Sequence, residues 1–529
     1  MGRMFSTVIV ASLVSTLLVG AASSVSAGES AHEVERQTLR PDAAGRTSYV
    51  EWEKPPADPN GTCMIILSED GDGNCGDRFI SIGCRCVKLV YDVSCADGGW
   101  KDGQRAVRIV RSQAAKRGFD PNRIGVVAMS GGARLAALLA TSSQTSAYEP
   151  VDEIDRSVPC NVNWAIIGAF DRLPDAAPAF RFDGKTAPMC MIHDGADYRA
   201  SLSLTQTYRQ LKRKKIPSEL HLCASSPEGA WFDRAREFMT QMEFLGPLAA
   251  PGKILLRYPD DSARGAYEKE NIWPTGKMPE VQTNQCTPYI EWHMPKTLKT
   301  KAIQIIYSGG AYNKNSPNGN EVAPFRRYLN AKGMAVVTMK YRTPRPAPPL
   351  EPHATAWQDL QRAIRIVKSK AESKGLDPSR IGVMGSSAGG HLSLLGAASS
   401  QTPAYAPIDE LDAIPCNVQW ALVIYPGYVF AGRKMRPEAP DGGELPLSPD
   451  LKFDSDTPPM ILMQGDSDVW SSVGCVKVWE RLGQMGVPCD LHTLALRPHC
   501  FQNKASPGTG SYTYLDRLWE FMDHIGANK

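Results

Sequence analysis

The sequence has no excess of charge of either sign. Its 59 lysines and arginines and 56 aspartates and glutamates leave a net charge of +3, and like charges do not gather into long blocks. Binding to phosphate backbones needs a basic field that such a chain does not provide. We therefore expect no nucleic-acid partner.

The sequence also lacks the spacings of a metal site. None of its 13 cysteines and nine histidines stands in a CxxC pair or in a Cys/His pattern that suits zinc, so we expect no metal. An odd number of cysteines cannot all pair within one chain. Cys84, Cys86 and Cys95 are crowded together and are the candidates for a local disulfide, although the sequence does not choose the pair.

The N-terminus differs from the rest of the chain. Arg3 supplies a positive start, residues 8–20 are mostly apolar, and Val25-Ser26-Ala27 offers the small residues that signal peptidase prefers. We expect residues 1–27 to be a signal peptide and the protein to be secreted or periplasmic. The alternative is an uncleaved anchor, but Ser and Gly dilute the run, and a membrane span needs about 20 strongly apolar residues. No stable span is expected after cleavage.

The chain repeats itself. A length of 529 residues exceeds what one ordinary core supports, and 42% hydrophobic residues are typical of packed domains. An offset of 257 carries Trp100 onto Trp357 and Ser130 onto Ser387, and a later offset of 271 carries Pro217 onto Pro488. We infer a tandem duplication of one domain, with residues 28–247 and 248–529 as the two copies.

Each copy alternates strands and helices. In the second copy, short apolar runs predict strands and longer amphipathic runs predict helices. The predicted strands are 302–307, 334–340, 381–385, 421–425, 459–464 and 490–494, and the predicted helices are 324–332, 357–373, 391–398 and 475–485. This order is typical of an α/β fold whose mostly parallel sheet carries helices on both faces.

A nucleophile motif stands between a predicted strand and a predicted helix. In Gly385-Ser386-Ser387-Ala388-Gly389 the small residues permit the sharp turn that lifts a serine out of a sheet. The context predicts Ser387 as a nucleophile. The alternative is a strand-helix turn with an idle serine.

The partners of such a serine follow in the order Asp, His. Asp468 follows the strand ending near residue 464, and His499 lies in a loop after the last strand. Asp466 competes with Asp468, but the first copy has Asp197 at the place of Asp468 and glycine at the place of Asp466. His492 competes less well because it lies inside the predicted last strand.

Backbone amides must meet the charge that develops on a substrate oxygen. The amide of Ala388 follows the nucleophile, and Gly309 and Gly310 leave an early strand where the backbone can approach a ligand. A plain tight turn is the alternative for the two glycines. Tyr312 and Trp470 lie near these loops and either bound the substrate or pack in the core.

These motifs together resemble a known family. They are Ser308-Gly309-Gly310, Lys340-Tyr341-Arg342, Gln361-Arg362-Ala363, the run from Asp377 through Ser387 to Leu392, and Tyr425-Pro426. From about Lys253 onward the chain resembles the bacterial acetylxylan esterase and feruloyl-esterase-like branch of the α/β hydrolases. The resemblance implies an exported serine ester hydrolase that needs no organic cofactor and removes acetyl or similar groups from plant-type polysaccharide or oligosaccharide.

The first copy keeps only part of this site. Ser130 and Asp197 are present, but Glu228 stands opposite His499, and Glu69-Asp70 stands opposite the two glycines. Carboxylates there would repel a developing oxyanion, so we predict that this copy is not catalytic. Carbohydrate binding, covering of the active half and a purely stabilising role all stay open for it.

Two other functions compete for the whole chain. One is a non-catalytic carbohydrate-binding or scaffold protein built from two pseudo-hydrolase domains, and the other is a peptidase or lipase, since a triad on this fold does not fix the substrate. The sequence shows no apolar lid of the kind expected of a lipase.

Overall fold

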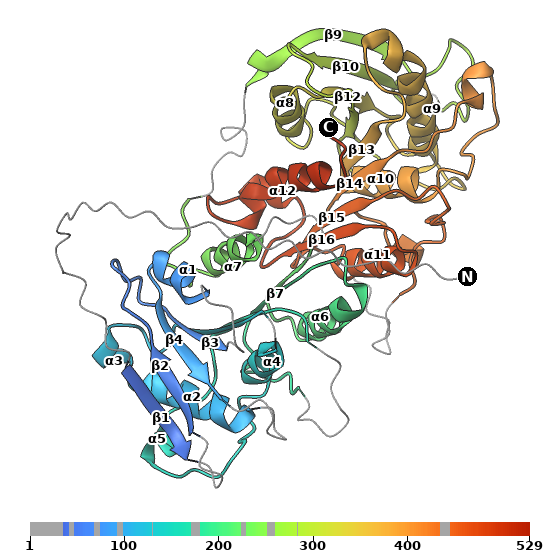
Figure 1. Ribbon diagram of the computed structural model, residues 1–529. Helices are drawn as coiled ribbons and strands as arrows, with labels where there is room; N and C mark the ends of the chain where they lie inside the picture. Colours follow the sequence, from blue (N-terminus) through green and yellow to red (C-terminus); the bar gives the residue numbers. More distant parts are fainter. Residues whose placement is uncertain are drawn as a thin grey trace, which may run out of the picture. The chain divides into compact units, whose positions relative to one another are not determined.

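A single sheet of 16 strands runs through the described residues of both halves of the chain (Figure 1). The computed structural model describes residues 35–41, 47–67, 75–91, 99–129, 131–170, 180–223, 229–250, 260–282, 284–433 and 445–529. They all belong to one unit, Glu35–Lys529. Among these residues no helix has the length and apolar character needed to cross a membrane.

The strands of the first half are β1 Glu35–Pro41, β2 Thr47–Trp52, β3 Cys63–Leu67, β4 Arg85–Val90, β5 Ile124–Ala128, β6 Trp164–Ile167, β7 Met189–His193 and β8 Ser218–Leu222. Those of the second half are β9 Arg264–Asn271, β10 Tyr289–Pro295, β11 Ile303–Tyr307, β12 Ala335–Lys340, β13 Ile381–Ser386, β14 Trp420–Ile424, β15 Met460–Gly465 and β16 Cys489–Leu494. Every residue of the central strands β11, β13, β14, β15 and β16 is buried, as expected for strands covered on both faces.

The strand order is the same in both halves, read from opposite ends of the sheet. It runs β1-β2-β4-β3-β5-β6-β7-β8 and continues as β16-β15-β14-β13-β11-β12-β10-β9. From β12 to β16 all neighbours are parallel, while β10 is antiparallel to both β9 and β12. The halves join through an antiparallel pair, β8 with β16, in which His221 faces His492.

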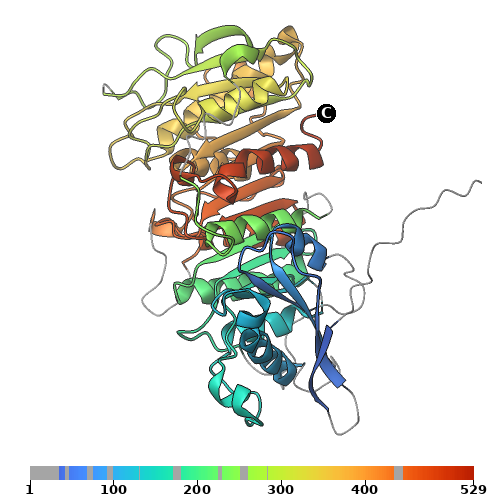
Figure 2. The same cartoon turned by 90° about the vertical axis from the view of Figure 1, so that its left-hand side faces the viewer.

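Helices cover the sheet on two faces (Figures 1 and 2). The larger core cluster is packed by α2 Trp100–Ser112, α4 Ala133–Thr141, α6 Tyr198–Arg213, α9 Ala354–Ala371, α10 Ala388–Ala398 and α11 Val473–Gln484. On the other face, α1 Cys75–Ser81 and α7 Ala230–Gln241 cover the first half, and α8 Ala323–Ala331 and α12 Gly510–His524 cover the second. The shorter helices are α3 Ala114–Arg117 and α5 Glu153–Ser157.

The elements predicted in the second copy are all present. α10 begins at Ala388, three residues before the predicted start at residue 391, because it starts directly after the turn at Ser387. α9 begins at Ala354, three residues before the predicted start. The architecture is an α/β fold with a mixed, largely parallel sheet. The predicted boundary between residues 247 and 248 stays a prediction, and the structure adds that the two halves share the sheet.

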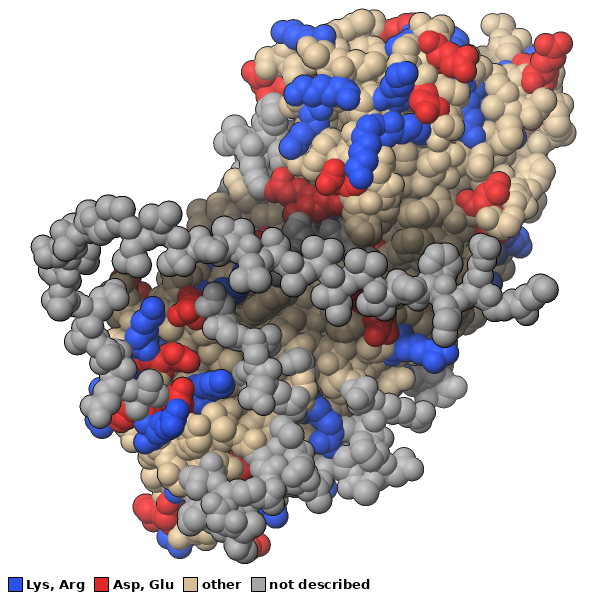
Figure 3. Space-filling model, in the orientation of Figure 1, with Lys and Arg blue, Asp and Glu red and all other residues tan. Residues whose placement is uncertain are grey.

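On the face shown in Figure 3, acidic and basic side chains are interspersed among uncharged ones.

Cys84 and Cys86 are both buried and free, so the local disulfide is not formed between them. The Cys84 sulfur accepts a hydrogen bond from Asn60, and the Cys86 thiol faces the Gly76 carbonyl. Cys95 lies outside the described residues.

Candidate active site

Ser387 stands at the junction of β13 and α10 in a conformation that few residues adopt. Its φ is 58° and its ψ is −119°, values that cost a side-chain-bearing residue free energy and that recur at functional sites. The turn is held by its backbone, because the Ser387 amide donates to the Ile424 carbonyl at 3.0 Å and its carbonyl accepts from His391 N–H at 3.0 Å. The residue is partly exposed.

The glycines around Ser387 are explained by close backbone contacts. A Cβ on Gly385 would lie 2.3 Å from the Gly389 carbonyl oxygen, and one on Gly389 would lie 2.8 Å from the Ser308 carbonyl oxygen. Such distances leave no room for a side chain. The close backbone packing in this turn therefore requires the two glycines of the motif.

Asp468 and His499 meet Ser387 at hydrogen-bond distance. His499 lies in the loop after β16, and its Nε2 is 2.7 Å from Ser387 Oγ. Its Nδ1 is 2.8 Å from Asp468 Oδ2. The carboxylate also accepts from Gln464 Nε2 at 3.1 Å and from Trp470 N–H at 2.9 Å, which fixes its plane.

The two competing residues lie elsewhere. Asp466 is buried against the first half, with its carboxylate 2.8 Å from Lys212 Nζ. His492 lies within β16 with its Nδ1 2.9 Å from His221 Nδ1, and burial holds the pKa of His492 well below its usual range. In the described part of the chain, no hydrogen bond or ion pair joins either of them to Ser387 or His499.

Of the three amides expected to hold an oxyanion, one is already engaged. Ala388 is the first residue of α10, where helix amides have no acceptor within the helix. Gly309 lies against the nucleophile, since a Cβ on it would be 2.6 Å from Ser387 Cβ. However, the Gly309 N–H donates to Glu321 Oε2 at 2.7 Å. Gly310 has a φ of 120°, which favours glycine, and its amide has no such bond described.

Glu321 is a site residue that the sequence reasoning missed. Its carboxylate is largely buried, and burial raises its pKa, while the bond from Gly309 opposes that rise. The hydroxyl of Tyr425 lies 3.4 Å from its Oε1. Glu321 is separated from Gly309 by 12 positions and belongs to no motif, so no sequence signal pointed to it.

A cavity of about 290 Å³ opens beside Gly309 and Gly310, the glycine loop. The residues that line it include Lys314, Asn320 and Glu321.

The two aromatic candidates differ in exposure. Tyr312 is only 1% exposed, and its hydroxyl lies 2.8 Å from His391 Nδ1, so it packs in the core rather than on an open surface. Trp470 is half-buried, and its ring centroid lies 4.6 Å from that of Tyr428. The structure therefore leaves Trp470, rather than Tyr312, accessible to a ligand.

Only one of the three residues of the first copy's counterpart site is described. Asp197 precedes α6 and caps it, accepting from the Ala200 amide at 3.0 Å. Ser130 and Glu228 lie outside the described residues, as do Glu69 and Asp70.

The groups of side chains that could hold a metal do not include Ser387, Asp468 or His499. Three groups occur in the described part of the chain: Cys190, Glu219 and His221; Cys223, Asp490 and His492; and Glu351, His353 and Asp450. In the first two groups both histidine rings are already hydrogen-bonded, with His221 Nε2 at 2.9 Å from Glu219 Oε2. The 2.9 Å between the two histidine Nδ1 atoms is also a hydrogen-bond length, shorter than the roughly 3.3 Å between ligand atoms of tetrahedral zinc.

Comparisons with known proteins give a consistent picture. The model of the BD-FAE family matches residues 290–413, which include Gly309, Gly310 and Ser387. The chain is 28% identical over 202 residues to the probable carboxylic ester hydrolase LipM of Mycobacterium tuberculosis, covering 34% of this chain and 44% of that protein. It is 34% identical over 100 residues to an acetylxylan esterase of Xylanibacter ruminicola, covering 19% of each. The matches thus span less than half the length of these relatives.

Some solved structures resemble part of the chain at lower sequence identity. An acetyl ester-xyloside bifunctional hydrolase from Caldicellulosiruptor lactoaceticus is 22% identical, with a TM-score of 0.39, and the match covers 49% of this chain and 96% of that one. Esterase 2 of Thermogutta terrifontis is 22% identical with a TM-score of 0.40, over 51% of this chain and 96% of that one. Over part of its length, the chain is thus similar to the BD-FAE family and to carboxylic ester hydrolases that include an acetylxylan esterase.

Proposed function

We propose that the protein is a secreted serine carboxylic ester hydrolase that removes acetyl or similar acyl groups from plant-type polysaccharide or oligosaccharide. The observation that carries the proposal is the unbroken chain of contacts from Ser387 Oγ through the His499 imidazole to the Asp468 carboxylate, at 2.7 and 2.8 Å. Nucleophile, base and orienting acid are in contact without any rearrangement, as acyl transfer requires.

The first half of the reaction forms an acyl-enzyme. His499 Nε2 takes the Ser387 proton as Oγ attacks the ester carbonyl carbon, and Asp468 stabilises the imidazolium that results. The amides of Ala388 and Gly310 supply donors to the oxyanion, since the Gly309 amide donates to Glu321. The ester C–O bond then breaks, and the alcohol leaves with the proton from His499.

The second half regenerates the serine. Water loses a proton to His499 as its oxygen attacks the acyl carbon, and the carboxylic acid leaves when Ser387 Oγ recovers that proton. This cycle is complete with the side chains and amides of this chain and one water molecule.

The substrate class rests on two supports. The sequence relatives include a probable carboxylic ester hydrolase and an acetylxylan esterase, and the cavity beside Gly309-Gly310 offers space for part of a substrate next to the nucleophile's turn. Secretion rests on the predicted signal peptide.

The first test is hydrolysis of 4-nitrophenyl acetate by the protein lacking residues 1–27. Ser387→Ala should lose nearly all activity, whereas Ser130→Ala, the corresponding change in the first copy, should keep the wild-type rate. Acetate release from acetylated xylo-oligosaccharide then tests the substrate class. An inactive wild type, or a Ser387→Ala variant as active as the wild type, would overturn the esterase proposal and favour a binding protein.

A further inference from the structure

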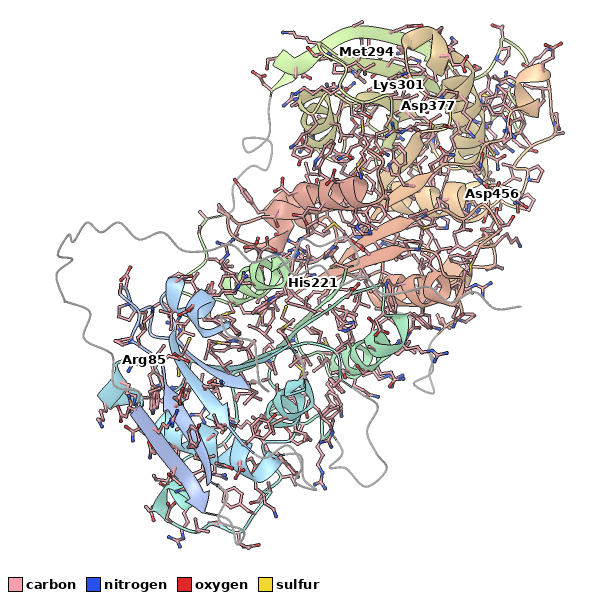
Figure 4. The ribbon with its side chains drawn as sticks, in the orientation of Figure 1. Arg85, His221, Met294, Lys301, Asp377 and Asp456 are labelled. Carbon is pink, nitrogen blue, oxygen red and sulfur yellow. The ribbon has the colours of Figure 1, made fainter. Side chains whose placement is uncertain are left out.

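The two halves meet around the strand pair β8 and β16. α6 and α11 pack together on one face of this seam, and α7 and α12 pack together on the other (Figures 1 and 2). Figure 4 labels His221, which lies on β8 and faces β16 at the centre of the seam. The seam therefore borders the strands whose ends carry Asp468 and His499.

One end of the loop that carries Asp468 is held by the first half. We define the acid loop as residues 466–472, between β15 and α11. Its first residue, Asp466, is only 3% exposed. Asp466 Oδ1 accepts from the Tyr208 hydroxyl at 3.0 Å and lies 2.8 Å from Lys212 Nζ, and both of these residues belong to α6.

The other end of the acid loop is held by the same tyrosine. Ser472 is fully buried and directly precedes α11, and its Oγ lies 2.6 Å from the Tyr208 hydroxyl oxygen. Because Tyr208 has one proton and donates it to Asp466, Ser472 donates to the phenol oxygen. One buried hydroxyl from the first half thus joins the two ends of the acid loop.

The acid loop is in turn tied to the loop of His499. The Asp466 amide donates to the Leu494 carbonyl at 2.8 Å, and the Ser467 amide donates to the Arg497 carbonyl at 3.0 Å, two residues before His499. A displacement of Asp466 would therefore move the acid loop relative to the loop that carries His499.

We infer that the first half has a positioning function, in which Tyr208 and Lys212 hold the acid loop so that Asp468 meets His499. This inference rests on the proposed esterase function for its catalytic consequence, but not for its structural content. It gives the first half a function that requires no chemistry of its own. Charged and hydrogen-bonded groups hold catalytic geometry well when they are buried and preorganised, as Tyr208 and Asp466 are.

The experiment compares Tyr208→Phe with Arg209→Gln in the full mature chain. Tyr208→Phe removes only the hydroxyl. Arg209 is the next residue of α6 and also crosses the seam, but its guanidinium contacts Glu480 at 2.6 Å, away from the acid loop. Two readouts are taken: amide hydrogen exchange of residues 466–468, and kcat and KM for 4-nitrophenyl acetate.

We expect Tyr208→Phe to speed exchange at residues 466–468 and to lower kcat by about tenfold with KM nearly unchanged, because misplacement affects the reacting geometry rather than binding. Arg209→Gln should leave both readouts near wild type. Equal exchange in Tyr208→Phe and wild type would overturn the inference, and so would equal losses in both variants, which would indicate a general effect of the seam.

Exchange also separates this inference from the proposed function. If the wild type hydrolyses nothing but Tyr208→Phe still loosens residues 466–468, the positioning contact stands and the esterase proposal fails. Should Tyr208→Phe not fold, Ser472→Ala removes the other partner of the hydroxyl; Ser472 makes no side-chain cap bond, so this change leaves the α11 cap intact. The same loosening is expected there, and its absence would overturn the inference.

Discussion

Replacement of Asp468 by asparagine tests the proposed role of this carboxylate most directly. Three donors converge on it: His499 Nδ1, Gln464 Nε2 and the Trp470 amide. A carboxylate can accept from all three, whereas an amide has only one oxygen. The variant must therefore present an NH₂ group to at least one of these donors.

The structure indicates which donor faces the NH₂ group. The Trp470 amide belongs to the backbone and cannot turn away from its acceptor, so the asparagine oxygen stays there at about the present 2.9 Å. The NH₂ group then points at His499 Nδ1 and donates to it. This leaves the imidazole proton on Nε2, directed at Ser387 Oγ, where a lone pair is needed to accept the serine proton.

We expect kcat for 4-nitrophenyl acetate to fall by about 10³ to 10⁴, equivalent to roughly 4 to 5 kcal/mol of lost transition-state stabilisation. KM should change little because the Asp468 side chain is fully buried behind His499. Asp466→Asn is the matched control, and it should lose no more than about tenfold, since the carboxylate of Asp466 contacts Lys212 and Tyr208 rather than His499. An Asp468→Asn variant within tenfold of wild type, or equal losses in the two variants, would refute this reasoning.

Three further predictions concern the turn, the seam and the core. Gly309→Ala would place a Cβ 2.6 Å from Ser387 Cβ and should lower kcat/KM at least about a hundredfold without unfolding the protein. The control Gly184→Ala should have no effect, because a Cβ there would meet nothing within 4 Å. Burial raises the pKa of Glu219 from 4.5 to about 7. Between these pH values the folded protein holds a proton on Glu219 that the unfolded chain releases, so the free energy of unfolding falls as the pH rises through that interval. Glu219→Gln should therefore gain up to about 3 kcal/mol of stability relative to wild type between pH 4.5 and 7 in urea unfolding, and a difference independent of pH would contradict the assignment. Asp359→Ala leaves the fully buried guanidinium of Arg342 without its carboxylate and should lower the free energy of unfolding by about 3 to 5 kcal/mol in denaturant. The control Glu268→Ala breaks an exposed pair with Lys374 and should cost less than about 1 kcal/mol. Similar losses in the two variants would contradict this prediction.

Local features of this site could be predicted because their causes are local. The turn at Ser387 needs small neighbours, and the structure places Gly385 and Gly389 against carbonyl oxygens at distances that exclude a Cβ. The buried strands could be predicted from their continuous apolar runs, since a strand covered on both faces has no polar side. Even the preference for Asp468 over Asp466 followed from comparing the two repeats.

What could not be predicted depends on contacts between distant segments. Glu321 reaches Gly309 only because the chain returns to the glycine loop before α8, and nothing in the composition of that segment marks it. Tyr208 and Lys212 form part of an ordinary amphipathic helix, so their contacts with Asp466 depend on the pairing of β8 with β16. For Tyr312, the sequence left core packing and ligand contact equal, and burial decides for packing.

The pairing of β8 with β16 also bears on how a chain with two similar halves can change. The offset of 271 that relates Pro217 to Pro488 also relates His221 to His492, and these two residues face each other in the antiparallel pair. Equivalent residues that face each other are the mark of an isologous interface, the kind that joins the subunits of a twofold dimer. In a dimer of identical chains every substitution appears twice, so a change that removes the catalytic base removes it from both sites. Covalent linkage lifts that restriction: one copy can lose its chemistry while it still supplies its side of the interface.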